Sequence, residues 1–276
     1  MRFEQFAAAH GLVVTGIEFG RWVRVATEDK PGHKNGAYKH MGDVAFVQNH
    51  ATMPEVACWF PDKDTDIKID RAEIERVRAN AAKQIEASRK SAQRKALDIM
   101  AKAKVEQHAY LDSKGFPEAR GLVHYLDEKT NLLVIPMRVG TQVVGCQLID
   151  KDGGKKFLFG QRCSGAEFCF DGKGVDVWCE GYATGLSINA VMAAIKARCC
   201  IHICFSAGNM EAMAKAAGRG FVIADNDASE TGAKAAKATG LPFFMPPIVG
   251  NDFNDLHRAC GTFSASQTLR EFMQTI

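Results

Sequence analysis

The 276-residue chain has no long apolar run. Its longest apolar stretches, such as residues 199–205, are far shorter than the about 18 residues that suggest a membrane-spanning helix. The N-terminal sequence MRFEQFAAAHG also lacks the apolar segment of a secretory signal peptide. With 46% hydrophobic residues, the chain can bury a proper core. We therefore expect a globular, cytoplasmic protein with no membrane partner.

The nine cysteines include no C-x-x-C pair of the kind that holds zinc. The most metal-like stretch is CCIHIC, in which Cys200, His202 and Cys204 alternate. Same-face neighbours on a strand lie roughly 6 to 7 Å apart, which is too far to share one zinc ion. We therefore predict reduced thiols, no zinc, and a buried strand at this position.

The chain also lacks a strong net charge, which is only +3 and does not by itself indicate a nucleic-acid partner. The positive excess is local, because residues 71–107 hold ten Lys and Arg against five Asp and Glu. This stretch has no Gly or Pro, and its apolar residues recur at three-, four- or seven-residue spacing, which predicts one long helix or two. These apolar residues are Ile74, Val77, Ala81, Ile85, Ala92, Ala96, Ile99 and Ala103. The basic residues form either a solvated face or a surface for nucleic acid or a partner protein.

Four regions follow from the pattern along the chain. Residues 1–64 predict a small α+β module, and 65–107 a basic helix or linker. Residues 108–172 predict a meander in which LLVIPMR, VVGCQLID and KKFLFG are strands joined at VGTQ and KDGG. Residues 173–276 alternate short apolar strands with helical segments, which indicates a parallel sheet covered on both faces.

Within the last region, four apolar segments predict the strands. They are VDVWC, CIHICF, GFVIA and LPFFM. The helical segments between them are residues 183–196, 209–217 and 228–238. The sequence SASQ, with Ser264 and Gln267, resembles a capping box and predicts the start of a terminal helix. The fold class is therefore α/β, with a mixed α+β part before the parallel sheet.

Acidic residues follow three of these strands. Glu180 comes directly after VDVWC, Asp225 and Asp227 follow GFVIA, and Asp252 and Asp255 follow the fourth strand. Ligands of open parallel sheets bind outside the carboxyl ends of the strands, so these acids should share one edge. Carboxylates without Cys or His nearby suit Mg²⁺ or Mn²⁺. The alternative for Asp227 is a helix N-cap without metal.

The order of these motifs resembles the Toprim domain of bacterial-type primases, type IA and II topoisomerases and some nucleases. The resemblance rests on E-G after the first strand, D-x-D after a later strand, and further acids beyond. The upstream segments LLVIPMR, CQLID and DGGKKFLFG are similar to the catalytic core of bacterial replicative primases, especially those of plasmids, integrative elements and phages. The resemblance implies a Toprim-type parallel sheet flanked by helices.

The resemblance also implies the roles of several residues. Glu180, Asp225 and Asp227 are expected to carry two Mg²⁺ or Mn²⁺ ions and the catalysis, with Asp252 and Asp255 as an additional acidic pair. The basic residues of the upstream subdomain are expected to meet nucleotide phosphates or the template. They are Arg138, Lys155 and Lys156.

The sequence departs from the replicative primases at three places. Thr184 stands where the cellular enzymes' E-G-Y-M-D motif has its last acid, which points to mobile-element relatives. Ser164 stands where a phosphate-binding lysine is expected. No zinc ribbon precedes the core, so template binding is expected from the 1–64 module.

Aromatic and basic residues interleave in that module, as in surfaces that bind single strands. They are Arg21, Trp22, Arg24, Lys34, Lys39, Phe46 and Trp59. The alternative is that the aromatic residues form the core of a small β module.

The expected function is a DNA primase that makes short RNA primers on single-stranded DNA during plasmid, phage or integrative-element replication. A Toprim nuclease and a non-catalytic DNA-binding or assembly subunit are the alternatives. Ribonucleoside triphosphates and a single-stranded DNA template are the expected partners. No G-x-x-x-x-G-K-S/T motif of a helicase is present, so unwinding would require a separate replication protein.

Overall fold

The computed structural model describes residues 1–53, 55–61 and 71–276, and the side chains of all of these except residues 71–74, 77 and 78. The predicted boundary at residues 64 and 65 lies outside the described residues, as do the side chains of Ile74 and Val77. The chain divides into two compact units, residues 1–87 and 88–276. The division falls within helix α2 (Arg71–Lys102). A mixed α/β architecture is confirmed.

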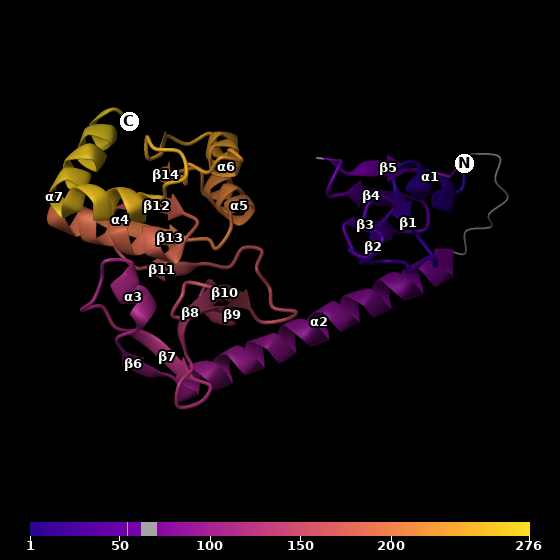
Figure 1. The fold of residues 1–276 in the computed structure, drawn as a ribbon, viewed down its shortest axis with the longest axis horizontal. Helices are drawn as coiled ribbons and strands as arrows, with labels where there is room; N and C mark the ends of the chain where they lie inside the picture. Colours follow the sequence, from indigo (N-terminus) through magenta and orange to yellow (C-terminus); the bar gives the residue numbers. More distant parts are fainter. Residues whose placement is uncertain (54, 62–70) are drawn as a thin grey trace. The chain divides into compact units, whose positions relative to one another are not determined.

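The first unit contains helix α1 (Phe3–Ala9) and an antiparallel sheet in the order β1-β2-β3-β4-β5 (Figure 1). The strands are β1 (Leu12–Val13), β2 (Trp22–Thr27), β3 (Gly36–His40), β4 (Ala45–Asn49) and β5 (Ala57–Trp59). Every second residue of β4 is buried, so one face of the sheet belongs to the core. On that face Tyr38, Val47 and Trp59 pack with Phe3 of α1.

Helix α2 is continuous and ends five residues before the predicted limit, at Lys102. Its C-terminal half buries Ala92, Ala96 and Ile99 against the apolar side chains of the next sheet. Ile85, by contrast, is 49% exposed. The apolar residues of α2 therefore pack against a core in the second unit, whereas Ile85, nearer the start of the helix, is largely exposed to solvent.

The second unit begins with a meander whose strands pair antiparallel in the order β10-β9-β8-β7-β6. Helix α3 (Ala109–Ser113) lies between the first two strands in the sequence. The strands are β6 (Lys104–Glu106), β7 (Gly121–Tyr125), β8 (Asn131–Val139), β9 (Gln142–Ile149) and β10 (Lys155–Phe157). Both predicted turns connect neighbouring strands, and in the second turn Asp150 accepts the backbone N–H of Gly154 at 2.7 Å.

The third sheet has the order β11-β13-β12-β14-β15. Strand β12 pairs parallel with β13 and β14, and β14 pairs parallel with β15. The strands are β11 (Phe168–Phe170), β12 (Val175–Cys179), β13 (Cys199–Ile203), β14 (Phe221–Ile223) and β15 (Phe243–Phe244). The sequence analysis did not predict β11, which pairs antiparallel with β13 at the edge.

Helices cover both faces of this sheet. Side chains of α4 and α7, such as Ile188 and Leu269, pack with Val177 and Ile203 on one face. Helices α5 and α6 pack on the other face around Trp178. The helices are α4 (Tyr182–Ala194), α5 (Ala207–Ala217), α6 (Thr231–Thr239) and α7 (Phe253–Gln274). Across the described residues, none of the helices has both the length and the apolar character needed to cross a membrane.

Two amide side chains, one buried and one half-buried, connect the segments before the third sheet to its helices. The Nδ2 of Asn254 in α7 donates to the carbonyl of Lys114 and to the hydroxyl of Ser187, both at 2.9 Å. The Nδ2 of Asn209 in α5 donates to the carbonyls of Ala166 and Cys204, both at 2.8 Å. These bonds fix the relative position of the two walls of the pocket described next.

Candidate functional site

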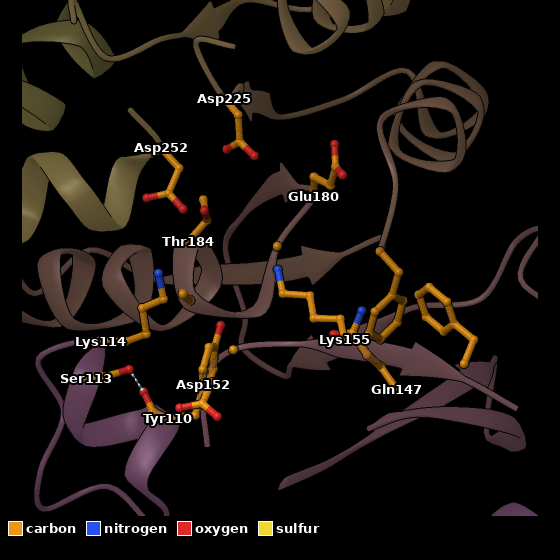
Figure 2. A pocket seen from close by; sticks show the side chains of 15 residues that line it. Tyr110, Ser113, Lys114, Gln147, Asp152, Lys155, Glu180, Thr184, Asp225 and Asp252 are labelled. Carbon is orange, nitrogen blue, oxygen red and sulfur yellow. Dashed lines mark hydrogen bonds between the residues drawn. The ribbon is translucent and has the colours of Figure 1, made fainter. Parts of the chain in front are cut away.

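A pocket of about 410 Å³ opens between the meander and the carboxyl ends of the parallel strands (Figure 2). One wall comes from α3, β9, β10 and the turn before β10, and the other from the segments after β12, β13 and β14, the first turn of α4 and the N-cap of α7. The lining residues are Tyr110, Ser113, Lys114, Gln147, Asp152, Gly153, Lys155, Phe157, Glu180, Gly181, Ala183, Thr184, Phe205, Asp225 and Asp252.

Three of the predicted acids lie together in this pocket. Figure 2 shows the carboxylates of Glu180, Asp225 and Asp252 on the same side of the cavity. Glu180 follows β12, and its carbonyl accepts the N–H of Phe205 at 2.9 Å, so the strand ladder continues past the end of β12. Asp225 follows β14 after one residue, and Asp252 is the N-cap of α7. Parallel strands end at a common edge, and this edge brings the acids together.

The electrostatics of these acids are those of a crowded, buried anionic site. Burial raises the pKa of Asp225 to about 7, and the charges of Asp252 and Glu180 act in the same direction. Burial is also the main cause that raises the pKa of Glu180, while Lys155 opposes the shift. The Oδ1 atom of Asp225 is buried without a hydrogen-bond partner among the described residues. Buried carboxylate oxygens normally have a partner.

The donor set of the pocket fits a hard divalent cation. Mg²⁺ and Mn²⁺ prefer carboxylate oxygens, which three residues supply here. A cation would give the orphaned oxygen of Asp225 a partner and would offset the repulsion between neighbouring carboxylates. Glu180, Asp225 and Asp252 are therefore the residues best placed to hold such an ion.

Two lysines face the acids from the opposite wall. The amino groups of Lys114 and Lys155 point toward the carboxylates in Figure 2. Lys155 was among the predicted phosphate-binding residues, whereas its neighbour Lys156 does not line the pocket. Successive side chains of a strand point to opposite faces, so β10 presents only one of the two lysines. Arg138 is also outside the lining; it is exposed, and its Nη1 donates to the carbonyl of Thr141 at 3.1 Å.

Asp227 occupies a different environment from Asp225, although only one residue separates them. It is half-buried, and its Oδ2 accepts the N–H of Gly232 at 3.0 Å in the first turn of α6. A hydrogen bond from the hydroxyl of Ser229, together with this backbone N–H, lowers the pKa of Asp227 to about 2. Its charge still raises the pKa of Asp225 and Glu180. The N-cap position of α6 is Glu230, so Asp227 is not the N-cap residue, although its carboxylate accepts the N–H groups of Thr231 and Gly232.

Asp252 and Asp255 form a capping box at the start of α7. The Oδ1 of Asp252 accepts the N–H of Asp255 at 2.8 Å, and the Oδ2 of Asp255 accepts the N–H of Asp252 at 3.1 Å. The predicted capping box at Ser264 and Gln267 is wrong, because both residues lie inside α7. The helix kinks at Gly261, where φ is 76°, and this kink separates the two halves. Asp255 does not line the pocket.

Glycines at two positions allow close packing beside the acids. A Cβ atom at Gly232 would overlap the carbonyl oxygen of Asp225, so α6 begins directly against the strand end. A Cβ atom at Gly185 would overlap the side chain of Ile203, so α4 lies close to β13. At Gly181, by contrast, the nearest atom is the hydroxyl of Thr184 at 3.7 Å, which leaves space at the pocket.

Several lining residues were missed from the sequence, among them Lys114, Asp152 and Phe205. Lys114 lies at the end of α3, in a segment to which the sequence patterns assign no functional residue. Phe205 has a φ of 67°, in the left-handed region, and its ring contacts Phe157 edge to face at 6.3 Å. Thr184, noted as a departure from the primase motif, lines the pocket with a buried hydroxyl that has no partner among the described residues.

The candidate template surface is only partly core. Trp59 is buried, and its Nε1 donates to the carbonyl of Met1 at 3.0 Å. Trp22 is 48% exposed and lies on the face of the sheet opposite the core, where its ring centroid is 6.5 Å from that of Phe46. Lys39 is the cross-strand partner of Trp22. Arg24 is exposed and follows two residues later on the same strand.

Two other basic residues of this region are less well placed. Arg21 is paired with Glu18, and Lys34 is exposed before the start of β3.

Comparison with known families identifies a Toprim domain at residues 177–262. This region begins in β12 and ends in α7, so it contains all five predicted acids. Neither a curated protein nor a solved structure gives a significant match to the chain. Toprim domains bind divalent ions such as Mg²⁺ and belong to proteins that process nucleic acids. The match supports a metal-dependent function on nucleic acid.

Proposed function

We propose that this protein is a DNA primase that joins ribonucleotides on a single-stranded DNA template. The observation that carries the proposal is the pocket between the Toprim region and the meander before it, where three carboxylates face two lysines across one cavity. Carboxylates and lysines on opposite walls suit a substrate that carries both phosphates and a bound cation. The meander before the Toprim domain resembles that of the replicative primases.

In the proposed reaction, the 3′-hydroxyl of one nucleotide attacks the α-phosphate of the next, and pyrophosphate leaves. Glu180, Asp225 and Asp252 would hold Mg²⁺ or Mn²⁺, which stabilises the attacking and leaving oxygens when bound. Lys155 and Lys114 would offset the charge of the triphosphate. Asp227 would add negative charge at the rim of the pocket, as a further ligand of a second ion.

The test is a template-dependent primer assay with labelled ribonucleotides, single-stranded DNA, and Mg²⁺ or Mn²⁺. The wild-type protein should incorporate label, and Asp225→Asn should abolish incorporation. The matched control is Asp98→Asn, which removes an exposed carboxylate paired with Lys102 on α2. Incorporation by Asp225→Asn at the wild-type rate would overturn the proposal.

The same assay separates the primase from its rivals. Metal-dependent loss of the DNA without incorporation would identify a nuclease that uses the same acids. DNA binding with neither incorporation nor cleavage, and without binding of Mg²⁺ or Mn²⁺, would identify a non-catalytic subunit.

The first unit is proposed to bind the template through the sheet face that carries Trp22, Arg24, Lys39 and Phe46. Aromatic rings can stack on bases while the basic groups contact phosphates. Trp22→Ala should weaken binding of a fluorescent single-stranded oligonucleotide about tenfold. The control is Phe263→Ala in the second unit, an aromatic residue that is 76% exposed. Equal affinities of the two variants would exclude this surface.

A further inference from the structure

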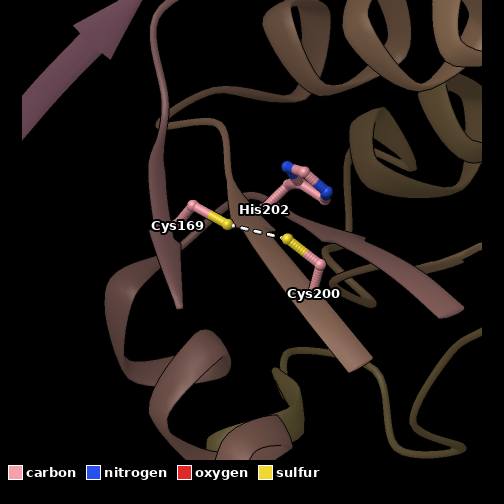
Figure 3. Close-up of side chains that lie close together, drawn as sticks. All are labelled: Cys169, Cys200 and His202. Carbon is pink, nitrogen blue, oxygen red and sulfur yellow. Dashed lines mark hydrogen bonds between the residues drawn. The ribbon is translucent and has the colours of Figure 1, made fainter. Parts of the chain in front are cut away.

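The side chains of two cysteines and one histidine lie close together on one face of the third sheet. Cys169 lies on β11 directly opposite His202 on β13, and Cys200 lies two residues before His202 on the same strand. The potential ligand atoms of these three residues all lie within 4.8 Å of one another (Figure 3). The two Sγ atoms are 3.0 Å apart. None of the three residues lines the pocket described above.

We propose that Cys169, Cys200 and His202 form a zinc-binding site. Two thiolates and an imidazole are a ligand set that Zn²⁺ prefers over harder ions such as Mg²⁺. With Zn–S bonds of about 2.3 Å, two sulfurs on one tetrahedral ion lie about 3.8 Å apart, so small side-chain rotations suffice. All three residues are half-buried, which leaves a path for the ion to enter.

The surroundings of His202 provide the supporting contacts of a metal-binding histidine. Its Nδ1 lies 2.6 Å from the Oε2 of Glu167, and its Nε2 lies 3.1 Å from the Oδ1 of Asp176. Asp176 is in turn held by Arg219 at 2.5 Å, and Trp178 stacks on the imidazole with a centroid distance of 4.0 Å. Metal-bound histidines commonly donate their second ring N–H to a carboxylate.

Binding of the ion would change only a few of these contacts. Zinc would bind one nitrogen of the neutral imidazole. Each ring nitrogen of His202 faces a carboxylate, so the imidazolium would release one proton to solvent, and each thiol would release its own. The carboxylate on the other nitrogen stays in place. A water molecule would complete the four ligands of the ion.

This site corrects the argument made from the CCIHIC sequence. The side chains of Cys200 and His202 approach each other more closely than their positions along the strand suggest. Cys204 is not part of the cluster; it is fully buried and its Sγ contacts the carbonyl of His202 at 3.8 Å. The third member, Cys169, comes from β11, a strand that the sequence analysis did not predict. A bound ion would fasten this edge strand to β13.

The experiment measures zinc retained by the reduced, purified full-length chain after dialysis. The wild-type protein should retain one Zn²⁺ per chain, and Cys169→Ser/Cys200→Ser should lose it. The control is Cys163→Ser/Cys260→Ser, which removes two exposed thiols and should retain the ion. Zinc should also raise the melting temperature of the wild type and of the control but not that of the cluster variant.

A second measurement does not depend on the folding of the cluster variant. Cys58→Ser/Cys163→Ser/Cys260→Ser lacks all the exposed cysteines. When loaded with Co²⁺, it should still show the thiolate-to-cobalt charge-transfer band of the proposed site. The exposed thiols are absent from this variant, so they cannot be the source of the band. Asp225→Asn should retain the zinc, which separates this site from the proposed function.

Three results would overturn the proposal. They are a wild-type protein that retains no zinc, equal zinc in the cluster variant, and a Cys169–Cys200 disulfide in metal-free protein detected by peptide mass spectrometry.

Discussion

Asp225 and Asp227 belong to the same D-x-D motif but lie in different environments. Asp225 lines the pocket, whereas Asp227 accepts hydrogen bonds at the start of α6. Asp225 is half-buried, with one buried carboxylate oxygen that has no hydrogen-bond partner among the described residues, and its pKa is raised to about 7. Asp227 is also half-buried, but its carboxylate accepts several hydrogen bonds and its pKa is lowered to about 2. The two acids of one D-x-D motif therefore differ in the donors that the fold brings to each carboxylate: one oxygen of Asp225 has none among the described residues, whereas Asp227 accepts N–H groups at the start of α6. The predictions below test this contrast.

The largest expected difference is between the two aspartates themselves. Asp225→Asn should lower ribonucleotide incorporation at least about 10³-fold, because a buried metal ligand contributes several kcal/mol to the transition state. Asp227→Asn should lower it about tenfold, because Asn keeps part of the cap and the lost charge lies at the rim. Initial rates at saturating Mn²⁺ measure both. Equal losses would show that the capping contacts do not set Asp227 apart.

The second prediction concerns stability in the absence of metal. The pKa of Asp225 is about 7 in the folded chain and about 3.9 in an unfolded chain, so the folded state binds more protons between these values. The free energy of unfolding should therefore fall as the pH rises from about 4 to about 7, by as much as a few kcal/mol. Urea denaturation in EDTA at several pH values measures this fall.

Two variants test whether the titration of Asp225 causes this pH dependence. Asp225→Asn should flatten the curve, whereas Asp98→Asn should leave it unchanged. Mn²⁺ at pH 8 should stabilise the wild type more than Asp225→Asn, because the ion binds the ionised carboxylate. A curve that Asp225→Asn does not alter would assign the titration to another group.

The third prediction compares Lys155, which lines the pocket, with Lys156, which does not. Lys155→Ala should raise the KM for ribonucleotides about tenfold, because one charge-assisted contact to phosphate is lost. Lys156→Ala should change the KM less than about twofold, since this lysine does not line the pocket. Steady-state kinetics at varied nucleotide concentration distinguish them. The reverse order of effects would mean that β10 presents its other face to the substrate.

The smallest effect is expected at the cap of α7. Asp255→Ala removes the bond to the N–H of Asp252 and should lower the free energy of unfolding by about 1 kcal/mol. Incorporation at saturating Mn²⁺ should stay within about twofold of the wild type. A loss as large as that of Asp225→Asn would make Asp255 a ligand instead of a cap.

Part of the candidate site could be predicted from the sequence because strand ends are marked locally. The alternation of apolar strands and helical segments locates Glu180 and Asp225 at the carboxyl edge, and the Toprim match covers the same residues. The position of Lys114 could not be predicted, because it depends on a hydrogen bond from Asn254 of α7, 140 residues later in the chain, to the carbonyl of Lys114. The cap at Asp252 was not predicted, because Asp252 and Asp255 were interpreted only as acids that follow the fourth strand.

The sequence by itself determined the mixed α/β fold, the Toprim region and the positions of its acids along the chain, because these depend on periodicity and on residue order. Only the tertiary structure decided which acids are buried together, which of two adjacent lysines faces them, and that Cys169 joins Cys200 and His202. These outcomes depend on strand pairing and register, which bring together side chains that are far apart in the sequence.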